Sequence, residues 1–344
     1  MPPGLARYRQ ILNGKSSARY LHCRSVQVDD HIQLSLDEKV RLHYDMMSDL
    51  QKRIETDGDV QIKRPNLLDL KLSIAKDMIR SCRFCEHRCG VDRASGKKGR
   101  CGVLGPRISS AFLHMGEEDV LVPSLTVFFS GCNLRCIYCQ NHDISTDPYS
   151  GSEIEPRKMA DIIEQMASGD GQRRRFSMKA KNVNWVGGEP TPDLHFILET
   201  LCHCSTNIPQ VWNSNMYLTE EAMRLLDGVV DVYLTDLKYG NDECGKRLSM
   251  VDRYMEVVTR NHLIAYSQAE VIVRHLVLPG HVDCCTLPAL EWIKDNIPGA
   301  LVNIMAQYRP MYLASSFPGM DRYITSDEFD RAVQHARGLD LDLI

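Results

Sequence analysis

From about residue 124 onward, short apolar runs alternate with helical patterns, and this alternation constrains the fold more than any other feature of the chain. The runs are apolar nearly throughout, which is typical of strands buried on both faces of a parallel sheet. The predicted strands are 125–130, 182–187, 210–215, 229–237, 270–278 and 301–308. The predicted helices are 156–168, 193–204, 219–227, 285–296 and 326–338. Six such units are fewer than the eight of a closed barrel, so an α/β fold with an open, partial (β/α)6 barrel is predicted.

Polar and unusual residues follow these strands at the point where each one ends. In barrels of parallel strands, functional side chains gather at the carboxyl ends of the strands. The residues at the six predicted tips are Cys132, Cys136 and Cys139; Gly187 to Pro190; Asn213 to Asn215; Asp236 and Lys238; Pro279 to His281; and Gln307 to Arg309. The agreement of six tips predicts one functional site at this end of the barrel.

The first third of the chain has a different pattern. Helical periodicity over 36–54 and 67–80 predicts two helices. We therefore expect a helical N-terminal extension over 1–80, a cysteine-rich module over 81–105, and the barrel over 120–344. The basic segment 1–28 lacks a clean amphipathic period, so we expect a solvated segment and not a transit peptide. The arginine run at 173–175 is expected to be a solvated loop.

The stretch GCNLRCIYCQN at 131–141 carries three cysteines, Cys132, Cys136 and Cys139. A structural zinc site needs four ligands, and disulfides need pairs. A cubane iron–sulfur cluster takes four thiolates, so three thiolates in one loop leave the fourth iron open. The spacing therefore predicts a cluster with one position free for a reactant.

The spacing CxxxCxxC, with Tyr138 before the last cysteine and Gly-Gly-Glu-Pro after the second strand, resembles the radical S-adenosylmethionine (SAM) superfamily. FFSGCNLRCIYCQN, WVGGEPTPDL, LTDLKYGN, VRHLVLPGH and NIMAQYRP are similar to the pyruvate formate-lyase-activating-enzyme-like group, especially a longer branch with an N-terminal cysteine cluster. The resemblance implies an oxidoreductase with a 4Fe-4S cluster whose open iron binds the amino and carboxylate groups of SAM. Reductive cleavage of SAM then gives methionine and a 5′-deoxyadenosyl radical, with the cofactor carrying the chemistry.

The resemblance also implies roles for single residues. Cys132, Cys136 and Cys139 would hold the cluster, and Tyr138 would border the adenine of SAM. The cofactor-contacting set would further include Gly187, Gly188, Glu189, Asp236, Lys238 and Arg274. Activating enzymes have an Asp-Thr-Asn-Gly-like turn after the third strand, and Asn213-Ser214-Asn215-Met216 stands there in this chain. Radical hydrogen abstraction needs no acid/base pair, so Glu189 and Asp236 are interpreted as SAM contacts.

A second group of cysteines, Cys82, Cys85, Cys89 and Cys101, has the spacing C-x2-C-x3-C-x11-C. Four thiolates in a segment too polar to build its own core indicate a closed metal site that replaces hydrophobic burial. Zinc and a second iron–sulfur cluster both fit the spacing. His87 lies between these ligands and is expected to be a bystander.

The six remaining cysteines are expected to be free thiols; they are Cys23, Cys202, Cys204, Cys244, Cys284 and Cys285. Cys244 lies after the fourth predicted strand, on the functional side, but an incidental loop cysteine is the simpler interpretation. For His281, at another strand tip, a substrate contact and a loop-capping role are equally consistent with the sequence.

The composition limits the partners and the location. The net charge of −4 argues against a general nucleic-acid binder, and no apolar run is long enough to cross a membrane. The many cysteines without a signal peptide predict metal binding in a reducing compartment, the cytoplasm. The resemblance implies a substrate protein and an electron donor such as a flavodoxin or ferredoxin.

Three functions remain open from the sequence. The first is hydrogen abstraction from a glycine of a partner protein, which would form a glycyl radical. The second is radical SAM modification of a small molecule or peptide. The third is a non-catalytic interaction module stabilised by zinc.

Overall fold

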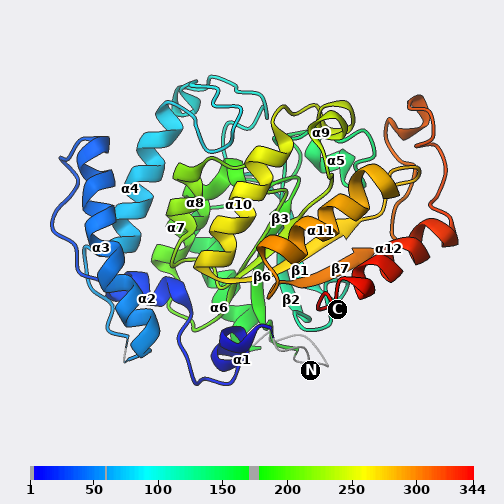
Figure 1. Cartoon of the computed structure of the whole chain (residues 1–344). Coiled ribbons are helices and arrows are strands. Elements are labelled where there is room, and N and C mark those ends of the chain that lie inside the picture. Colours follow the sequence, from blue (N-terminus) through cyan, green and yellow to red (C-terminus); the bar gives the residue numbers. More distant parts are fainter. Residues whose placement is uncertain (1–3, 59, 170–177) are drawn as a thin grey trace.

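A seven-stranded sheet forms the centre of the computed structural model, which describes residues 4–58, 60–169 and 178–344 (Figure 1). The strands are β1 (Ile108–His114), β2 (Ser124–Phe129), β3 (Asn182–Gly187), β4 (Gln210–Ser214), β5 (Val232–Asp236), β6 (Glu270–Leu276) and β7 (Leu301–Met305). The arginine run at 173–175 lies outside the described residues.

Strands β2 to β7 are parallel and lie in sequence order, while β1 pairs antiparallel with β2 at one edge. The sheet runs from β1 to β7 and does not close on itself. Six parallel strands in an open sheet confirm the predicted partial (β/α)6 barrel.

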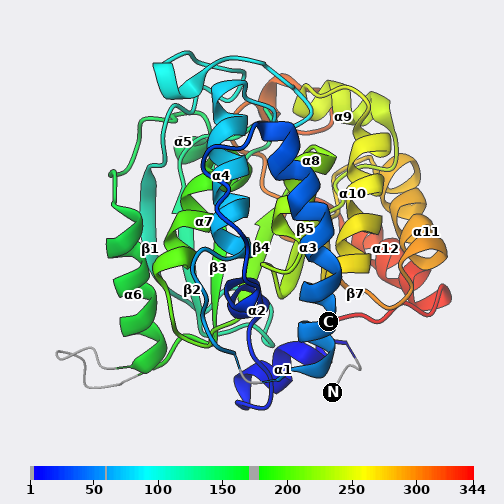
Figure 2. The same ribbon diagram turned by 90° about the vertical axis from the view of Figure 1, so that its left-hand side faces the viewer.

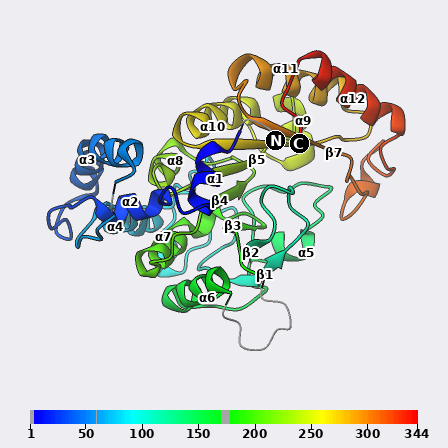
Figure 3. The ribbon, with the colours of Figure 1, turned by 90° about the horizontal axis from the view of Figure 1, so that it is seen from below.

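The helices between the strands lie in an arc on the outer face of the curved sheet, as the view from below shows (Figure 3). These helices are α6 (Pro156–Ser168), α7 (Leu194–His203), α8 (Glu220–Leu226), α10 (Tyr254–Gln268), α11 (Leu287–Asn296) and α12 (Ser326–Gly338). Short helices α5 (His142–Ser145) and α9 (Asp242–Ser249) lie in loops that follow the carboxyl ends of β2 and β5. All predicted helices are present, with ends shifted by a few residues.

The sequence missed two elements whose burial pattern hides them. Strand β1 is an edge strand in which only Ile108 is buried, so it lacks an apolar run. Helix α10 buries Asn261 and His262, which interrupt its apolar stripe. The Asn261 amide donates hydrogen bonds to the carbonyls of Met216 and Leu218, so a polar side chain is satisfied inside the core.

Three predicted strands are too long. The predicted strand at 229–237 begins only at Val232, because the carboxylate of Asp231 accepts hydrogen bonds from the backbone N–H groups of Arg19 and Gln210. Strands β6 and β7 also end earlier than predicted, at Leu276 and Met305. After β6 the apolar run continues into a buried loop, whereas after β7 the chain turns through the exposed Ala306 and Gln307.

The floor of the barrel is closed by the N-terminal helix α1 (Ala6–Leu12). Leu5 and Tyr8 pack into a small interior core with inward-facing strand residues such as Val211, Leu234 and Ile272. Alternate residues on the same strands face the outer helices in the main core. The expectation of a solvated segment over 1–28 is therefore wrong for the described residues, because α1 packs into the bottom of the barrel and buries Tyr8 there.

The other N-terminal helices, α2 (Arg19–Ser25), α3 (Leu36–Thr56) and α4 (Leu67–Arg80), form a layer outside the barrel (Figure 2). Capping boxes begin α3 at Ser35 and α4 at Asn66. Helix α4 contacts α7, so this layer covers the helices of the first barrel units. Among the described helices, none combines the length and the apolar character that a membrane crossing needs.

Candidate cofactor site

The three cysteines of the 131–141 loop follow β2 and line one cavity at the carboxyl ends of the strands. Gly131 begins the loop at a φ of +88°, where a Cβ would lie 2.4 Å from the side chain of Val103. The backbone N–H of Leu134 lies 3.4 Å from the sulfur of Cys132. Hydroxyl oxygens approach the other two sulfurs, with Ser249 at 3.0 Å from Cys136 and Ser145 at 3.2 Å from Cys139.

Every other strand tip of the parallel sheet contributes to the same cavity. The predicted cofactor-contacting residues that line it are Tyr138, Gly187, Gly188, Glu189, Asp236, Lys238 and Arg274. The cavity is thus the place where the sheet brings together residues far apart in sequence. Asn213, Ser214, Asn215, Met305 and Gln307 also line it.

Gly187 and Gly188 are required by packing within the protein. A Cβ on Gly187, which has a φ of +127°, would lie 2.1 Å from the backbone nitrogen of Phe129. A Cβ on Gly188 would lie 2.1 Å from the carbonyl oxygen of Gly131. The tip of β3 therefore lies directly against the backbone that leads into the cysteine loop, and any side chain would push the two apart.

Glu189 connects the tips of β3 and β4. One carboxylate oxygen accepts hydrogen bonds from the hydroxyls of Thr191, at 2.5 Å, and Ser214, at 2.7 Å. The other accepts from the backbone N–H of Asn215 at 3.0 Å. Burial raises the pKa of Glu189, although these hydrogen bonds oppose that shift.

The turn at Asn213 to Met216, which departs from the activating-enzyme pattern, also reaches the cysteine loop. The side-chain amide of Asn215 donates to the Asn133 side chain at 2.7 Å and lies 3.7 Å from the sulfur of Cys132. Met216 adopts a φ of +60°. The sequence marked this turn only as a departure; the structure shows that it supports the loop that carries the cysteines.

Asp236 and Lys238 form an ion pair of 2.7 Å on the wall of the cavity. Burial alone would lower the pKa of Lys238, but the carboxylate of Asp236 and the nearby Cys136 sulfur raise it above its usual value. The lysine therefore stays protonated, and the pair presents both charges to a zwitterionic ligand.

Arg274 lines the cavity, but two carboxylates that the sequence did not indicate hold its guanidinium group. Glu118 accepts two hydrogen bonds from it at 2.7 Å, and Glu117 accepts one at 2.5 Å. Burial would raise the pKa of Glu118, but the hydrogen bonds from Arg274 hold it below its usual value. These glutamates lie in the connection between β1 and β2 and not at a strand tip, so the strand-tip rule could not find them.

Tyr138 belongs to a chain of hydroxyl groups that ends at the cysteine loop. Its hydroxyl lies 2.8 Å from that of Tyr239, which lies 2.6 Å from the Ser249 hydroxyl. The Ser249 hydroxyl in turn contacts Cys136. Burial raises the pKa of Tyr138 well above its usual value, so the phenol stays protonated. Ser249 had no signal in the sequence because it ends α9, a helix that only packing brings to this loop, while Tyr239 lies in the LTDLKYGN motif but had no predicted role.

Residues 126–293 of the chain, which include the three cysteines of the cavity, match the family model of the Radical SAM superfamily. The chain is 45% identical over 350 residues to "Uncharacterized protein MJ0674" of Methanocaldococcus jannaschii, with 99% of both proteins covered. The chain belongs to the radical SAM superfamily.

The chain is also similar to more distant proteins. This radical SAM enzyme is 27% identical over 184 residues to "Pyruvate formate-lyase 1-activating enzyme" of Escherichia coli (strain K12), which covers 53% of this chain and 71% of the relative. Among solved structures it is similar to Streptococcus suis SuiB bound to precursor peptide SuiA, with 11% identity and a TM-score of 0.46. That match covers 87% of this chain and 62% of the other.

The family's cofactors are a 4Fe-4S cluster and SAM, and the cavity fits both. Three cysteine sulfurs line it, and no other cysteine among the described residues does. Burial raises the pKa of the Cys136 thiol to about 11, so binding of iron at neutral pH must release a proton. Lys238 and Asp236 offer charges that match the carboxylate and amino groups of SAM. When bound, the reduced cluster would supply one electron for the cleavage of SAM, and SAM would supply the radical that abstracts hydrogen.

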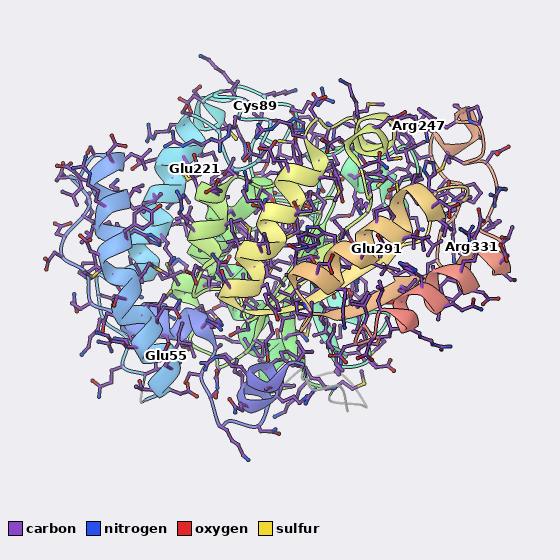
Figure 4. All side chains as sticks on the ribbon, viewed as in Figure 1. Glu55, Cys89, Glu221, Arg247, Glu291 and Arg331 are labelled. Carbon is purple, nitrogen blue, oxygen red and sulfur yellow. The ribbon has the colours of Figure 1, made fainter. Side chains whose placement is uncertain are left out.

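The second cysteine group lies at the same end of the radical SAM enzyme, where Figure 4 labels Cys89. Burial raises the pKa of Cys85, and the nearby Cys101, Cys82 and Cys89 raise it further. The four residues thus face one another across the module. The ring of His87 donates a hydrogen bond to the Asn133 carbonyl at 2.8 Å, so this module contacts the other cysteine loop directly.

Four thiols gathered in one module suit both metals that the sequence left open, a zinc ion and an iron–sulfur cluster.

A buried arginine joins this module to the turn after β3. Arg93 donates hydrogen bonds to the carbonyls of Val103, at 2.8 Å, and Pro192, at 2.7 Å. Its guanidinium group also lies 3.8 Å from the carboxylate of Asp193, and both side chains are fully buried. Burial raises the pKa of Asp193 to about 7, against the opposing effect of Arg93.

We expect Arg93→Leu to lower the free energy of unfolding by about 3–5 kcal/mol, because it leaves Asp193 as an unpaired buried carboxyl. In the folded state this carboxyl holds its proton more tightly than in the unfolded chain, so its contribution to stability falls as the pH rises from about 4 through 7. The loss in the variant should therefore be larger at about pH 8 than at about pH 5. Thermal unfolding followed by circular dichroism at both pH values measures this.

A matched control is Arg88→Ala on the same module, because Arg88 and its partner Glu221 are solvent-accessible and its other partner, the buried Glu86, keeps an ion pair with Arg260. Its effect should stay within about 1 kcal/mol. Adding Asp193→Asn to Arg93→Leu should recover part of the loss. An equal loss in the Arg93 and Arg88 variants would contradict the role of the buried pair.

Proposed function

We propose that this radical SAM enzyme abstracts a hydrogen atom from a glycine of a partner protein and so leaves a glycyl radical there. The observation that supports this most directly is the match to a pyruvate formate-lyase 1-activating enzyme, which covers 71% of that relative. The name of that relative says that it activates another protein. The proposal carries this type of substrate, and not that particular protein, to the present chain.

The roles we propose for single residues are those that the resemblance to activating enzymes implies, and all of these residues line the one cavity. Cys132, Cys136 and Cys139 ligate the cluster. Gly187, Gly188 and Glu189 receive the amino group of SAM, while Asp236 and Lys238 lie near its carboxylate. Tyr138 borders the adenine, and Arg274, fixed by Glu117 and Glu118, faces the ligand from β6.

The rim of the cavity offers a surface for a polypeptide. After β7 the chain returns toward the cysteine loop, where the side-chain amide of Gln140 donates to the Gln307 carbonyl at 2.7 Å and the N–H of Leu313 donates to the Ile137 carbonyl at 2.8 Å. Tyr312 and Leu313 are exposed in this returning segment, and the Tyr312 ring stacks on His142. Exposed aromatic and aliphatic side chains beside a reactive cavity are suited to contact with a partner protein.

The open sheet is consistent with a substrate that is too large to be enclosed. Between β7 and β1 no strand closes the barrel in the described chain. The connection between β1 and β2 reaches across this side, where Glu118 accepts a hydrogen bond from Asn303 of β7 at 2.9 Å. We propose that a loop of a partner approaches the cavity beside this connection. An electron must also enter, and we propose a flavodoxin or ferredoxin as the donor.

The test is anaerobic incubation of the reconstituted enzyme with reductant, SAM and proteins from the same organism labelled with deuterated glycine. We expect deuterium in 5′-deoxyadenosine and a carbon-centred protein radical in the electron paramagnetic resonance spectrum. A matched reaction with Cys136→Ala should show neither signal.

The result that would overturn the proposal is deuterium that arrives only from a labelled small metabolite. The enzyme would then be a radical SAM enzyme that acts on a small molecule. Transfer from a labelled short peptide, without a stable radical on any protein, would likewise replace glycyl-radical formation by peptide modification.

A further inference from the structure

Four potential metal ligands meet on the rim of the barrel, away from both cysteine groups described above. They are Cys244 at the start of α9, His281 after β6, and Cys284 and Cys285 in the segment that follows. Their ligand atoms all lie within 4.8 Å of one another. The Nδ1 atom of His281 lies 3.5 Å from the Cys244 sulfur and 3.2 Å from the Cys284 sulfur, and the sulfurs of Cys284 and Cys285 are 3.8 Å apart.

We propose that these residues bind one zinc ion through three cysteines and one histidine, as a third metal site of this chain. Zinc bonds of about 2.3 Å to sulfur and 2.0 Å to nitrogen place tetrahedral ligands roughly 3.5–3.8 Å apart, which is the range of spacing found here. The set closes the coordination shell with protein atoms alone, which is the mark of a structural and not a catalytic zinc site. The three cysteines and the histidine come from two segments that are far apart in the chain, so nothing in the sequence spacing marked them as one group.

An unusual backbone feature places the two adjacent cysteines. Val282–Thr286 form a π-helix, and the backbone N–H groups of Cys285 and Thr286 both donate to the carbonyl of His281. π-helical turns are rare and are often found at functional sites. The extra residue in this turn brings Cys284 and Cys285 to the same side as His281.

Hydrogen bonds and backbone packing within the protein hold the loop after β5 against this π-helical turn. The Asn241 side chain accepts a hydrogen bond from the N–H of Cys244 at 2.8 Å and donates one to the Cys284 carbonyl at 2.7 Å. A Cβ on Gly240 would lie 2.8 Å from the carbonyl of Cys285, so the two loops pack backbone to backbone. The ligands are therefore held in place, which lowers the entropy lost on metal binding.

Arg247 is the one neighbour that must move. Its guanidinium group lies 3.0 Å from the Nε2 atom of His281. When Nδ1 binds a metal, Nε2 carries the proton, and it can no longer accept a hydrogen bond. The Arg247 side chain is exposed at the surface of α9, as Figure 4 shows, so it can turn into solvent without breaking the core.

A zinc ion at this site would stabilise helix α9, which contacts the cysteine loop at 131–141. Helix α9 extends from Asp242 to Ser249, with Cys244 in its first turn. At its other end, the carbonyls of Leu248 and Ser249 accept hydrogen bonds from Ile137 and Arg135 of the cysteine loop, and the Ser249 hydroxyl contacts Cys136. A zinc ion at Cys244 thus fixes the helix that supports Cys136.

The experiment measures zinc in the anaerobically purified, iron-loaded enzyme by mass spectrometry and by X-ray absorption at the zinc edge. We expect about one zinc per chain, with three sulfur ligands and one nitrogen ligand. Zinc should fall at least tenfold in Cys244→Ala and His281→Ala. Cys284→Ala should show the same loss with a normal fold, because Cys284 is exposed.

Two variants separate this site from the rest of the molecule. Arg247→Ala, which removes the neighbour and no ligand, should keep its zinc, and so should Cys85→Ala in the N-terminal group. Zinc that is unchanged in Cys284→Ala, or that disappears in Cys85→Ala, would overturn the proposal. A zinc spectrum with four sulfur ligands, or iron in place of zinc at this site, would overturn it as well.

Discussion

Replacement of Cys132, Cys136 and Cys139 by alanine is expected to reduce the cleavage of SAM to 5′-deoxyadenosine to the background of the reductant alone. All three sulfurs line the same cavity, and together they are the only cysteines among the described residues that do so. Without them nothing in the cavity can hold an iron–sulfur cluster, because its other polar residues are carboxylates, amides and cations. Chromatographic detection of 5′-deoxyadenosine after anaerobic incubation with dithionite and SAM measures the loss.

The control for this prediction is Cys202→Ala, a cysteine on α7 that is buried far from the cavity lining. It should keep the activity of the parent enzyme. The variant of all three cysteines should also keep its fold, because backbone hydrogen bonds hold the loop without the sulfurs. The N–H of Gly131 donates to the Ile144 carbonyl at 2.8 Å, and the N–H of Ile137 donates to the Leu248 carbonyl at 2.9 Å. SAM cleavage at the parent rate in the triple variant would show that these cysteines do not ligate the catalytic cluster.

The sequence predicted the sheet and the cavity because both follow from local patterns. Apolar runs such as 182–187 are strands wherever they are buried, and parallel strands bring their ends to one edge. Gly187, Glu189, Asp236 and Arg274 therefore meet Cys132 in space as soon as the strand order is known. No knowledge of side-chain packing is needed for this step.

Other parts of the site depend on packing that one sequence does not show. Glu117 and Glu118 fix Arg274 from the connection between β1 and β2, and β1 itself has no apolar pattern. Ser249 reaches Cys136 only because the end of α9 docks on the cysteine loop. These contacts join segments more than a hundred residues apart, and no local periodicity encodes them.

The proposed zinc ligands Cys244, His281, Cys284 and Cys285 likewise could not be grouped from the sequence alone. In the sequence, Cys244 is an isolated cysteine whose simplest interpretation is incidental, and His281 is an isolated strand-tip histidine that fits a substrate contact and a loop-capping role equally well. The fold brings β5 and β6 side by side, and this pairing places the loops that follow them in contact. Ligands from two loops thus form a group that motif spacing cannot reveal.

The second prediction with a large effect concerns the N-terminal cysteine group. We expect Cys85→Ala to lower the melting temperature by roughly 5 °C or more, because a metal that holds a module without its own core contributes its binding free energy to folding. Cys85 is well placed to transmit the loss, since it forms a β-bridge with Leu218 at the start of the segment that leads into α8. Thermal unfolding under anaerobic conditions measures the effect, with Cys202→Ala as the control.

Metal analysis then identifies the occupant. In the variant that lacks Cys132, Cys136 and Cys139, the metal of the N-terminal group should remain, and about four irons per chain would identify it as an iron–sulfur cluster. Adding Cys85→Ala should remove the metal of the N-terminal group. Adding Cys284→Ala should instead remove only the zinc proposed at Cys244, His281, Cys284 and Cys285. Zinc that depends on Cys85 would instead assign a single-ion site to the module.

The N-terminal cysteine group lies close enough to the cavity for an iron–sulfur cluster there to exchange electrons with the catalytic cluster. His87 donates to the carbonyl of Asn133, and the Asn133 side chain accepts from Asn215, whose amide lies beside the sulfur of Cys132. Only a few hydrogen-bonded groups therefore separate the two cysteine groups. A redox-active cluster in the module could pass an electron toward the cavity, while a zinc ion could only hold the fold. The iron content of the Cys85→Ala series thus decides whether this module is part of the electron path, and a stability loss without iron would restrict it to a structural role.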